Sequence, residues 1–273
     1  MTVERIKRAD DPRLAGYHGV RDGELARSRG LFVAEGRQVV RRVVEDGRYR
    51  VQSVLVNDAA LRDLDETLAR LGADVPIVVC GRDELAGIAG YDVHRGCLAL
   101  VQRPALLTAD ELITAAPMLV VLEAVSNPDN VGGVFRNVAA FGGAGVLLSP
   151  TSCDPLYRKA VRTSMGAVLS VPYARAADAD WPGVLARAGA AGFTLAALTP
   201  REPSETLESF AAGPWRRRIA LIIGAEGAGL TPAAEAIADY RIRIPISDRV
   251  DSLNLAVAAG IALYQLRNSE LGT

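Results

Sequence analysis

The chain has 273 residues, of which 49% are hydrophobic and 23% are charged, and its formal net charge is −1. These values are ordinary for a globular protein of one or two domains. They exclude a generally basic nucleic-acid-binding protein, because such a protein carries a large positive charge.

Neither the apolar runs nor the cysteines and histidines of the sequence indicate a membrane segment or a metal site. No apolar run reaches the eighteen or so residues of a membrane span, and the charged stretch 1–22 lacks the apolar core of a signal peptide. We therefore expect a cytoplasmic protein with no membrane segment. Three scattered cysteines (Cys80, Cys97 and Cys153) and two histidines fit neither a disulfide framework nor a zinc site. We expect buried thiols and no metal.

The basic residues are almost all arginine, the exceptions being Lys7 and Lys159. A GC-rich genome explains most of this bias. Residues 1–50 hold 12 Arg and Lys against 8 Asp and Glu, and this excess includes Arg37, Arg41, Arg42, Arg48 and Arg50. Guanidinium groups suit phosphate because they make two charge-assisted hydrogen bonds. Charge alone leaves two interpretations open, a local RNA contact and a solvated helix face.

The first hundred residues predict a small α/β unit. Helical periodicity extends over residues 32–47 and 59–72, and strand-like apolar runs occupy 51–57, 75–80 and 97–102. Residues 103–117 read as a linker with a short helix, because a proline stands near each end.

The rest of the chain predicts a parallel sheet. Strand-like runs occupy residues 118–125, 144–149, 168–173, 193–199, 219–224 and 240–245. Helical stretches separate most of them, which favours a parallel sheet covered on both faces. Ligand sites in such sheets lie at the carboxyl ends of the strands, so the loops that follow the strands are the candidates.

The first candidate loop follows strand 118–125. Residues 127–129 predict a turn, and Asn130 predicts the cap of a helix beginning at the next residue. Gly133 keeps the first turn slim. Arg136 lies on another side of this helix from Asn130 but can reach back toward its start. A capped helix with an exposed arginine is the alternative interpretation.

The second candidate loop follows strand 219–224 and reads GAEGAGL. Its glycines, Gly224, Gly227 and Gly229, match neither the dinucleotide nor the phosphate-loop spacing. Glu226 lies inside this turn, and a carboxylate there repels phosphate. The ligand is therefore not expected to be held by its phosphates.

The third candidate loop leads into a helix over residues 251–266. Ser252 predicts the N-cap, with Asn254 close behind. Small residues at positions 256, 258, 259, 260 and 262 predict a neighbour that approaches very closely.

Taken together, the three loops resemble the SpoU (TrmH-like) family of RNA ribose methyltransferases, within the SPOUT superfamily. The resemblance covers roughly residues 117–270, and its three motifs occur in the family's order. The matching residues are Asn130, Gly133 and Arg136, then Gly224, Glu226, Gly229 and Leu230, then Ile244, Pro245, Ser252, Leu253 and Asn254.

The resemblance implies S-adenosylmethionine as methyl donor, a ribose 2′-hydroxyl of RNA as acceptor, and a homodimer through a deep trefoil knot. It divides the chain into a ribosomal-protein-like RNA-binding domain, residues 1–105, and a catalytic domain, residues 106–273. Ribosomal RNA of the 23S type is favoured as substrate over transfer RNA. A knotted RNA-binding protein without activity is the other alternative. A nucleotide-dependent oxidoreductase is disfavoured because the glycine fingerprint is absent.

The resemblance also implies the site residues. The catalytic set is Arg136, Asn130, Glu226, Ser252 and Asn254, and the cofactor-binding set is Leu198, Thr199, Gly224, Ile244, Ile246 and Leu253. Arginine has a pKa above about 12, so we assign Arg136 to orienting the ribose and stabilising the developing alkoxide; action as the base stays open. Two structural roles also stay open, Glu226 holding its own turn and Ser252 capping its helix.

Overall fold

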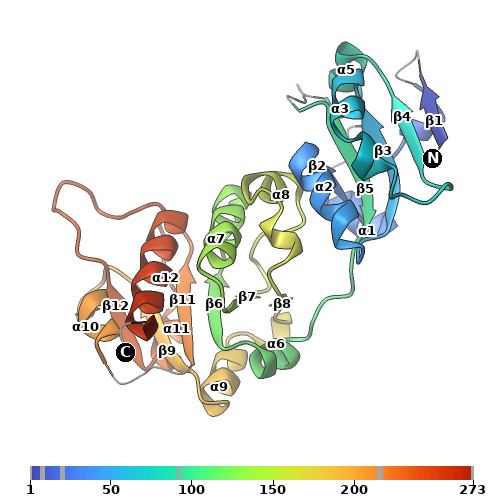
Figure 1. Cartoon of the computed structure of the whole chain (residues 1–273). Helices are drawn as coiled ribbons and strands as arrows, with labels where there is room; N and C mark the ends of the chain where they lie inside the picture. Colours follow the sequence, from blue (N-terminus) through green and yellow to red (C-terminus); the bar gives the residue numbers. More distant parts are fainter. Residues whose placement is uncertain are drawn as a thin grey trace. The chain divides into compact units, whose positions relative to one another are not determined.

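The computed structural model describes residues 2–6, 10–18, 22–90, 93, 95–213 and 218–271 (Figure 1). The chain forms two compact units. Unit 1 comprises Met1–Ala105 and Leu156–Leu169, and unit 2 comprises Leu106–Pro155 and Ser170–Thr273. This division differs from the predicted domains, 1–105 and 106–273, because segment 156–169 packs with unit 1.

Unit 1 is built on a mixed five-stranded sheet of order β1-β4-β3-β5-β2. β1, β4 and β3 are parallel, whereas β5 runs antiparallel to β3 and β2. The strands are β1 (Thr2–Arg5), β2 (Leu31–Glu35), β3 (Val51–Val56), β4 (Pro76–Val79) and β5 (Cys97–Gln102). The helices are α1 (Asp22–Arg29), α2 (Arg37–Asp46), α3 (Asp58–Asp63), α4 (Asp65–Leu68), α5 (Arg82–Ala89) and α8 (Arg158–Thr163), with 3-10 turns η1 (Pro12–Leu14) and η2 (Ala167–Leu169).

The predicted helix over 32–47 is wrong in its first part. Residues Leu31–Glu35 are all buried and pair with β5 as strand β2. Gly36, with φ of 97°, turns the chain into α2. A short run that is buried all round has no period that separates strand from helix. The three predicted strands are confirmed as β3, β4 and β5, and the predicted helix 59–72 is two short helices, α3 and α4.

Unit 2 is built on a seven-stranded sheet of order β10-β12-β9-β11-β6-β7-β8, in which every pair is parallel. The strands are β6 (Met118–Glu123), β7 (Ala144–Leu148), β8 (Tyr173–Arg175), β9 (Thr194–Leu198), β10 (Glu205–Thr206), β11 (Ile219–Gly224) and β12 (Tyr240–Arg243). The helices are α6 (Ala109–Ala115), α7 (Pro128–Phe141), α9 (Gly183–Ala190), α10 (Leu207–Ala211), α11 (Pro232–Ile237) and α12 (Leu255–Leu271), with a 3-10 turn η3 (Asp178–Asp180).

Both faces of this sheet are buried, as the near-continuous apolar strands predict. Leu119 and Val121 of β6 share a core with α6, α9 and α11. The alternate residues Val120 and Leu122 are also fully buried. The predicted strand 168–173 is wrong. Val168 and Leu169 lie in the turn η2, and β8 begins only after Pro172, which cannot donate to a ladder.

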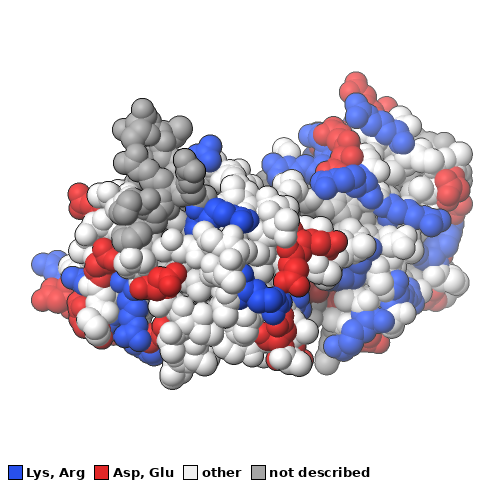
Figure 2. Space-filling model, turned by 90° about the horizontal axis from the view of Figure 1, so that it is seen from below, with Lys and Arg blue, Asp and Glu red and all other residues white. Residues whose placement is uncertain are grey.

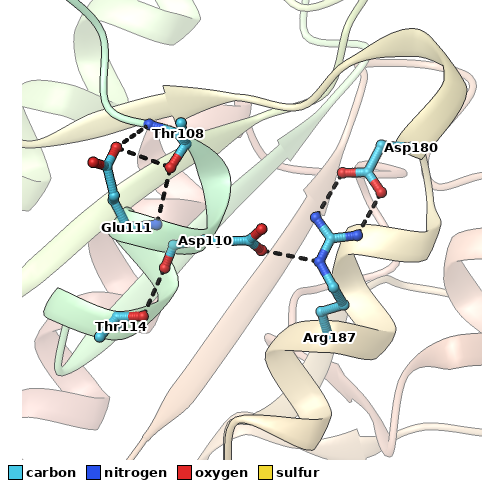
Figure 3. A network of polar contacts seen from close by, with 6 residues as sticks. All are labelled: Thr108, Asp110, Glu111, Thr114, Asp180 and Arg187. Carbon is cyan, nitrogen blue, oxygen red and sulfur yellow. Dashed lines mark hydrogen bonds and ion pairs between the residues drawn. The ribbon is translucent and has the colours of Figure 1, made fainter.

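The predicted linker 103–117 does carry a short helix, α6, and polar side chains contact it at both ends. Figure 3 shows the contacts of Thr108, Asp110 and Glu111. Thr108 and Glu111 form a capping box at its start. Arg187 of α9 bridges Asp110 and Asp180, with an Nε–Oδ1 distance of 2.9 Å to Asp110. At the other end, the Arg218 guanidinium donates to the carbonyls of Ile113 and Ala116. These contacts satisfy carbonyls that a helix end otherwise leaves open.

The neighbour that the small residues of α12 predict is α7. A Cβ added at Gly133 would lie 2.6 Å from the Cβ of Ala256, and one added at Gly260 would lie 3.0 Å from Asn137 Nδ2. Asn137 Nδ2 donates to the carbonyl of Ala256 at 2.6 Å. Glycine and alanine therefore allow the two helix backbones to approach closely.

We predict that Gly133→Ala lowers the free energy of unfolding by up to about 2 kcal/mol. The overpacking cost of about 1–3 kcal/mol exceeds the gain of about 1 kcal/mol from replacing a helical glycine. Gly189→Ala in α9 is the matched control, because its Cβ would meet Leu195 at an ordinary 3.6 Å. Chemical denaturation measures both. Equal stability of the two variants would contradict the close packing of α7 on α12.

Candidate active site

The three candidate loops meet at the carboxyl edge of the unit 2 sheet. Because the strands are parallel, the ends of β6, β11 and β12 all lie at this edge. Glu123, the last residue of β6, pairs in register with Gly224, the last residue of β11. α7 begins just beyond β6, and α12 follows the loop after β12.

One side-chain amide joins the three loops. Asn254 Nδ2 donates to Asn130 Oδ1 at 3.0 Å and to Glu226 Oε1 at 3.1 Å. Asn130 is buried, with 4% of its surface exposed, whereas Asn254 and Glu226 are exposed. We call these three residues the amide bridge. It holds one residue of each predicted motif in direct contact.

Two predicted helix caps are wrong. Asn127 caps α7, its Oδ1 accepting from the amide of Asp129 at 3.0 Å, so Asn130 lies inside the first turn. Asn254 caps α12, its Oδ1 accepting from the amides of Ala256 and Val257. Ser252 is exposed and lies too far before the helix for this role. Each cap is the residue directly before the first helical residue, a boundary that sequence patterns place poorly.

Arg136 is not part of the amide bridge. Asn130, Gly133 and Asn137 form the face of α7 toward α12. Arg136 is exposed, and it makes no hydrogen bond or ion pair with any residue in the described part of the chain. Its guanidinium is therefore available to a ligand.

The predicted cofactor residues lie along the ends of β9, β11 and β12. Leu198 pairs with Ile223 on one side and Ile242 on the other. Thr199 is buried, and its amide donates to the carbonyl of Ile242 at 2.9 Å. Leu198, Gly224, Ile244 and Leu253 are half-buried and Ile246 is exposed.

Gly224 is required by its own turn. A Cβ at this position would lie 2.2 Å from the carbonyl carbon of Gly229 and 2.3 Å from the amide nitrogen of Leu230. The turn therefore folds back against β11 at a distance that only glycine permits. Glu226 stands at the tip of this turn.

Glu123 is a functional candidate that the sequence patterns missed. Its buried carboxylate accepts from the amide and hydroxyl of Thr231, both at 2.8 Å, and from Trp181 Nε1 at 3.1 Å. Thr231 caps α11 at the end of the turn that carries Glu226. Glu123 thus holds the end of that turn in place through its hydrogen bonds to Thr231. The only signal for it in the sequence is an acidic residue inside an apolar run.

A second buried network holds the loop before α7. Ala124 has a φ of 55°, which is rare for a residue with a side chain. Its amide donates to Ser149 Oγ at 2.8 Å, and the Ser149 and Ser152 hydroxyls are 3.0 Å apart. Arg175 donates to the carbonyls of Ser149, Pro150, Ser152 and Cys153. These contacts hold the loop that leads to Asn130.

The cysteines are buried thiols, as predicted. Burial raises the pKa of Cys80 to about 11 and raises the pKa of Cys97 as well. Thiolate is the nucleophilic form, so burial disfavours the reactive form of both thiols. Within the described residues, no three His, Cys, Asp or Glu side chains form a group that could hold a metal. No described helix is long and apolar enough to cross a membrane.

The model of the SpoU rRNA Methylase family matches residues 117–264. An uncharacterized tRNA/rRNA methyltransferase of Mycobacterium bovis is 38% identical over 273 residues, covering 98% of this chain and 93% of the relative. One of Mycolicibacterium gilvum is 32% identical over 235 residues, covering 82% of this chain and 73% of the relative.

Solved structures share the fold. An AdoMet-bound rRNA methyltransferase from Sinorhizobium meliloti has a TM-score of 0.80 at 24% identity, covering 97% of this chain and 98% of that one. A SpoU methyltransferase from Streptomyces viridochromogenes has a TM-score of 0.78 at 22% identity, covering 96% and 98%. The likeness extends over both units.

We predict that Asn254→Ala lowers the free energy of unfolding by about 1 kcal/mol, because α12 loses its cap. Asn254→Ser retains a capping oxygen and is therefore expected to lose less stability than Asn254→Ala, although both variants lose the hydrogen bond to the buried Asn130. Ser252→Ala is the control and leaves stability unchanged. Chemical denaturation measures all three. If Ser252→Ala lowers the free energy of unfolding as much as Asn254→Ala does, Ser252 and not Asn254 is the N-cap of α12.

Proposed function

The chain belongs to the SpoU rRNA methylase family of S-adenosylmethionine-dependent RNA methyltransferases, and we propose that it methylates a ribose 2′-hydroxyl of structured RNA. The observation that carries this proposal is the amide bridge, in which Asn254 contacts Asn130 and Glu226. It brings the three motifs of the family resemblance to one edge of the sheet, next to an exposed arginine.

The strand ends beside the amide bridge suit S-adenosylmethionine. Leu198, Ile244 and Leu253 present half-buried apolar side chains there, which an adenine ring can cover. The nearby carboxylate of Glu226 favours a cationic ligand over a phosphate. We propose that Leu198, Thr199, Gly224, Ile244, Ile246 and Leu253 hold the cofactor. When bound, it supplies a methyl group on a positively charged sulfur, which is an already activated leaving group.

The protein must then place the hydroxyl and accept its developing charge. Holding two reacting atoms in line can supply several kcal/mol. A guanidinium offers a planar set of charged donors and no acceptor, so we assign Arg136 to orienting the ribose or its phosphate and to stabilising the alkoxide. Asn130, Glu226 and Asn254 hold the loops around it, and Ser252 stands exposed at the same mouth. The alternative, Arg136 as base, requires a neutral guanidinium.

We propose the trefoil knot of the family for residues 240–271. β12 lies between β9 and β10, whereas α12, which follows it, contacts α10 and packs most extensively against α7, the helix that follows the central strand β6 in sequence. The intervening loop therefore crosses the carboxyl ends of the central strands. This crossing supports a threaded chain.

We propose a homodimer through the exposed face of α12. Val257, Ile261 and Tyr264 recur at helical spacing and are 52%, 40% and 55% exposed. A row of large apolar side chains on one helix face is typical of an interface. We propose that a second copy of this chain covers this face, because the resembled family forms homodimers.

A double substitution tests the dimer. We predict that Val257→Glu with Ile261→Glu converts the protein to a monomer, because each protomer would bury two added charges. Val3→Glu is the control, since Val3 is similarly exposed (40%) on β1. Sedimentation equilibrium measures the mass. A wild-type monomer, or a double variant that still dimerises, would contradict this interface.

We propose unit 1 as the RNA-binding part and ribosomal RNA as the substrate, with transfer RNA as the alternative. The two-unit layout, which covers nearly the whole length of the Mycobacterium bovis relative, supports an enzyme with a separate substrate-binding part. An RNA-binding protein without activity remains the competing function. The exposed Arg136 and the complete amide bridge favour the enzyme.

The product of the reaction tests the function. With methyl-labelled S-adenosylmethionine and protein-free ribosomal RNA, we predict label in alkali-stable dinucleotides, because a 2′-O-methyl group removes the nucleophile of alkaline cleavage. We predict that Arg136→Ala lowers transfer by about 10²–10³-fold while cofactor affinity stays within a few-fold, as measured by calorimetry.

Three results would overturn these assignments. Label released as base-methylated mononucleotides would contradict ribose methylation, and no label in ribosomal or transfer RNA would favour the inactive alternative. Loss of cofactor binding in Arg136→Ala would show that Arg136 binds the cofactor rather than the RNA ribose. Arg136→Lys keeps the charge but not the planar fork, so we expect only partial recovery of transfer.

A further inference from the structure

The segment 156–169 belongs to unit 1 although strands of unit 2 flank it in sequence. The chain leaves unit 2 after Pro155 and re-enters it at Ser170. Between these points it forms α8 and η2. α8 packs against β2, the edge strand of the unit 1 sheet (Figure 1).

Specific contacts fix this segment on unit 1. Glu35, at the end of β2, is buried, and Arg162 Nη1 lies 3.3 Å from its Oε1 while Arg158 Nε lies 3.9 Å from its Oε2. At the other end of the segment, the Tyr49 hydroxyl donates to the carbonyl of Leu169 at 2.6 Å. A carboxylate buried beneath two arginines is costly to leave unpaired, so α8 is held in a defined place.

The segment supplies the positive charge of unit 1. Residues 1–105 hold 17 Arg and Lys against 16 Asp and Glu, so they are almost neutral. Residues 156–169 hold Arg158, Lys159 and Arg162 and no acidic residue. Unit 2 holds 11 Arg and Lys against 16 Asp and Glu. Most of the net positive charge of unit 1 therefore comes from this segment.

Several arginines of residues 1–50 form ion pairs, which offset part of the positive charge that the sequence shows there. Arg13 pairs with Asp11 and Glu4, Arg48 pairs with Asp46, and Arg37 and Arg41 lie within 4 Å of Asp63. Figure 2 shows a face of the molecule on which basic and acidic side chains are interspersed.

Two further arginines border the segment. A Cβ at Gly166 would lie 3.3 Å from Arg42 Cδ, and Arg95 Nη1 lies 4.0 Å from Met165 Sδ. Lys159, Arg162 and Arg42 are exposed. The resulting cluster, which we call the α8 basic surface, consists of Arg42, Arg95, Arg158, Lys159 and Arg162. The buried Glu35 lies against Arg158 and Arg162, and Asp22 accepts from the backbone amide of Arg158.

We propose that the α8 basic surface binds the phosphate backbone of the RNA substrate. This inference rests on the proposed function and assigns part of RNA binding to residues outside 1–105. Arginine and lysine side chains on one surface engage consecutive phosphates and release counterions, which makes binding dependent on salt but not on base sequence. The surface positions the RNA and leaves the choice of nucleotide to other contacts.

The test neutralises three exposed cations together, as Arg42→Gln, Lys159→Gln and Arg162→Gln. Arg158 keeps its contact with Glu35 in this variant. The matched control is Arg5→Gln, Arg13→Gln and Arg62→Gln, which removes the same charge from β1, η1 and α3 of unit 1. Filter binding to protein-free ribosomal RNA and to transfer RNA is measured over a range of salt. Thermal unfolding checks that both variants fold.

We expect the α8 variant to bind RNA about tenfold more weakly at 0.1 M salt, with a salt slope lower by about two to three. KM for RNA rises while kcat and cofactor affinity stay unchanged. Wild-type affinity and slope in the α8 variant, or an equal loss in the control variant, would overturn the proposal. RNA binding through this surface without ribose methylation would support the surface and overturn the proposed function.

Discussion

The site depends on one side-chain amide. Asn254 caps α12 with its oxygen and holds Asn130 and Glu226 with its nitrogen. The same residue therefore sets where the helix begins and where two other loops stand. This arrangement is only reached because Gly133 and Ala256 let α7 and α12 approach closely. Larger side chains at positions 133 and 256 would push the two helices apart and separate Asn130 from Asn254 even without a ligand.

Buried polar side chains also hold the loops of the amide bridge in place through hydrogen bonds. Glu123 fixes the cap of α11, and with it the turn of Glu226. Ser149 holds the strained Ala124 on the way to Asn130. Such groups cost free energy to bury unless they are fully hydrogen-bonded. Satisfied as they are here, they keep the loops in place, while Arg136 stays exposed. Rigid loops beside the exposed guanidinium of Arg136 fit the proposed reaction, in which positioning of the hydroxyl supplies part of the catalysis.

Sequence patterns gave the parallel sheet and the three loops of the site, because strand hydrophobicity and the loop motifs are local signals. They misplaced both caps, since Asn127 and Asn130, or Ser252 and Asn254, are equally good capping residues until the helix boundary is known. They read Leu31–Glu35 as helix, because a short buried run has no period of its own. They did not place segment 156–169 on unit 1 or find Glu123, because these depend on contacts between residues far apart in the chain. The knot, the dimer and the cofactor residues rest on the family resemblance.

A double-mutant cycle on methyl transfer tests the amide bridge most directly. Asn130→Ala and Asn254→Ser each remove one side of the bridge, and the serine preserves the α12 cap. If the bridge acts as one unit, the double variant loses no more kcat/KM than the worse single variant, within about threefold. Losses that multiply would show that Asn130 and Asn254 act independently and would contradict the account.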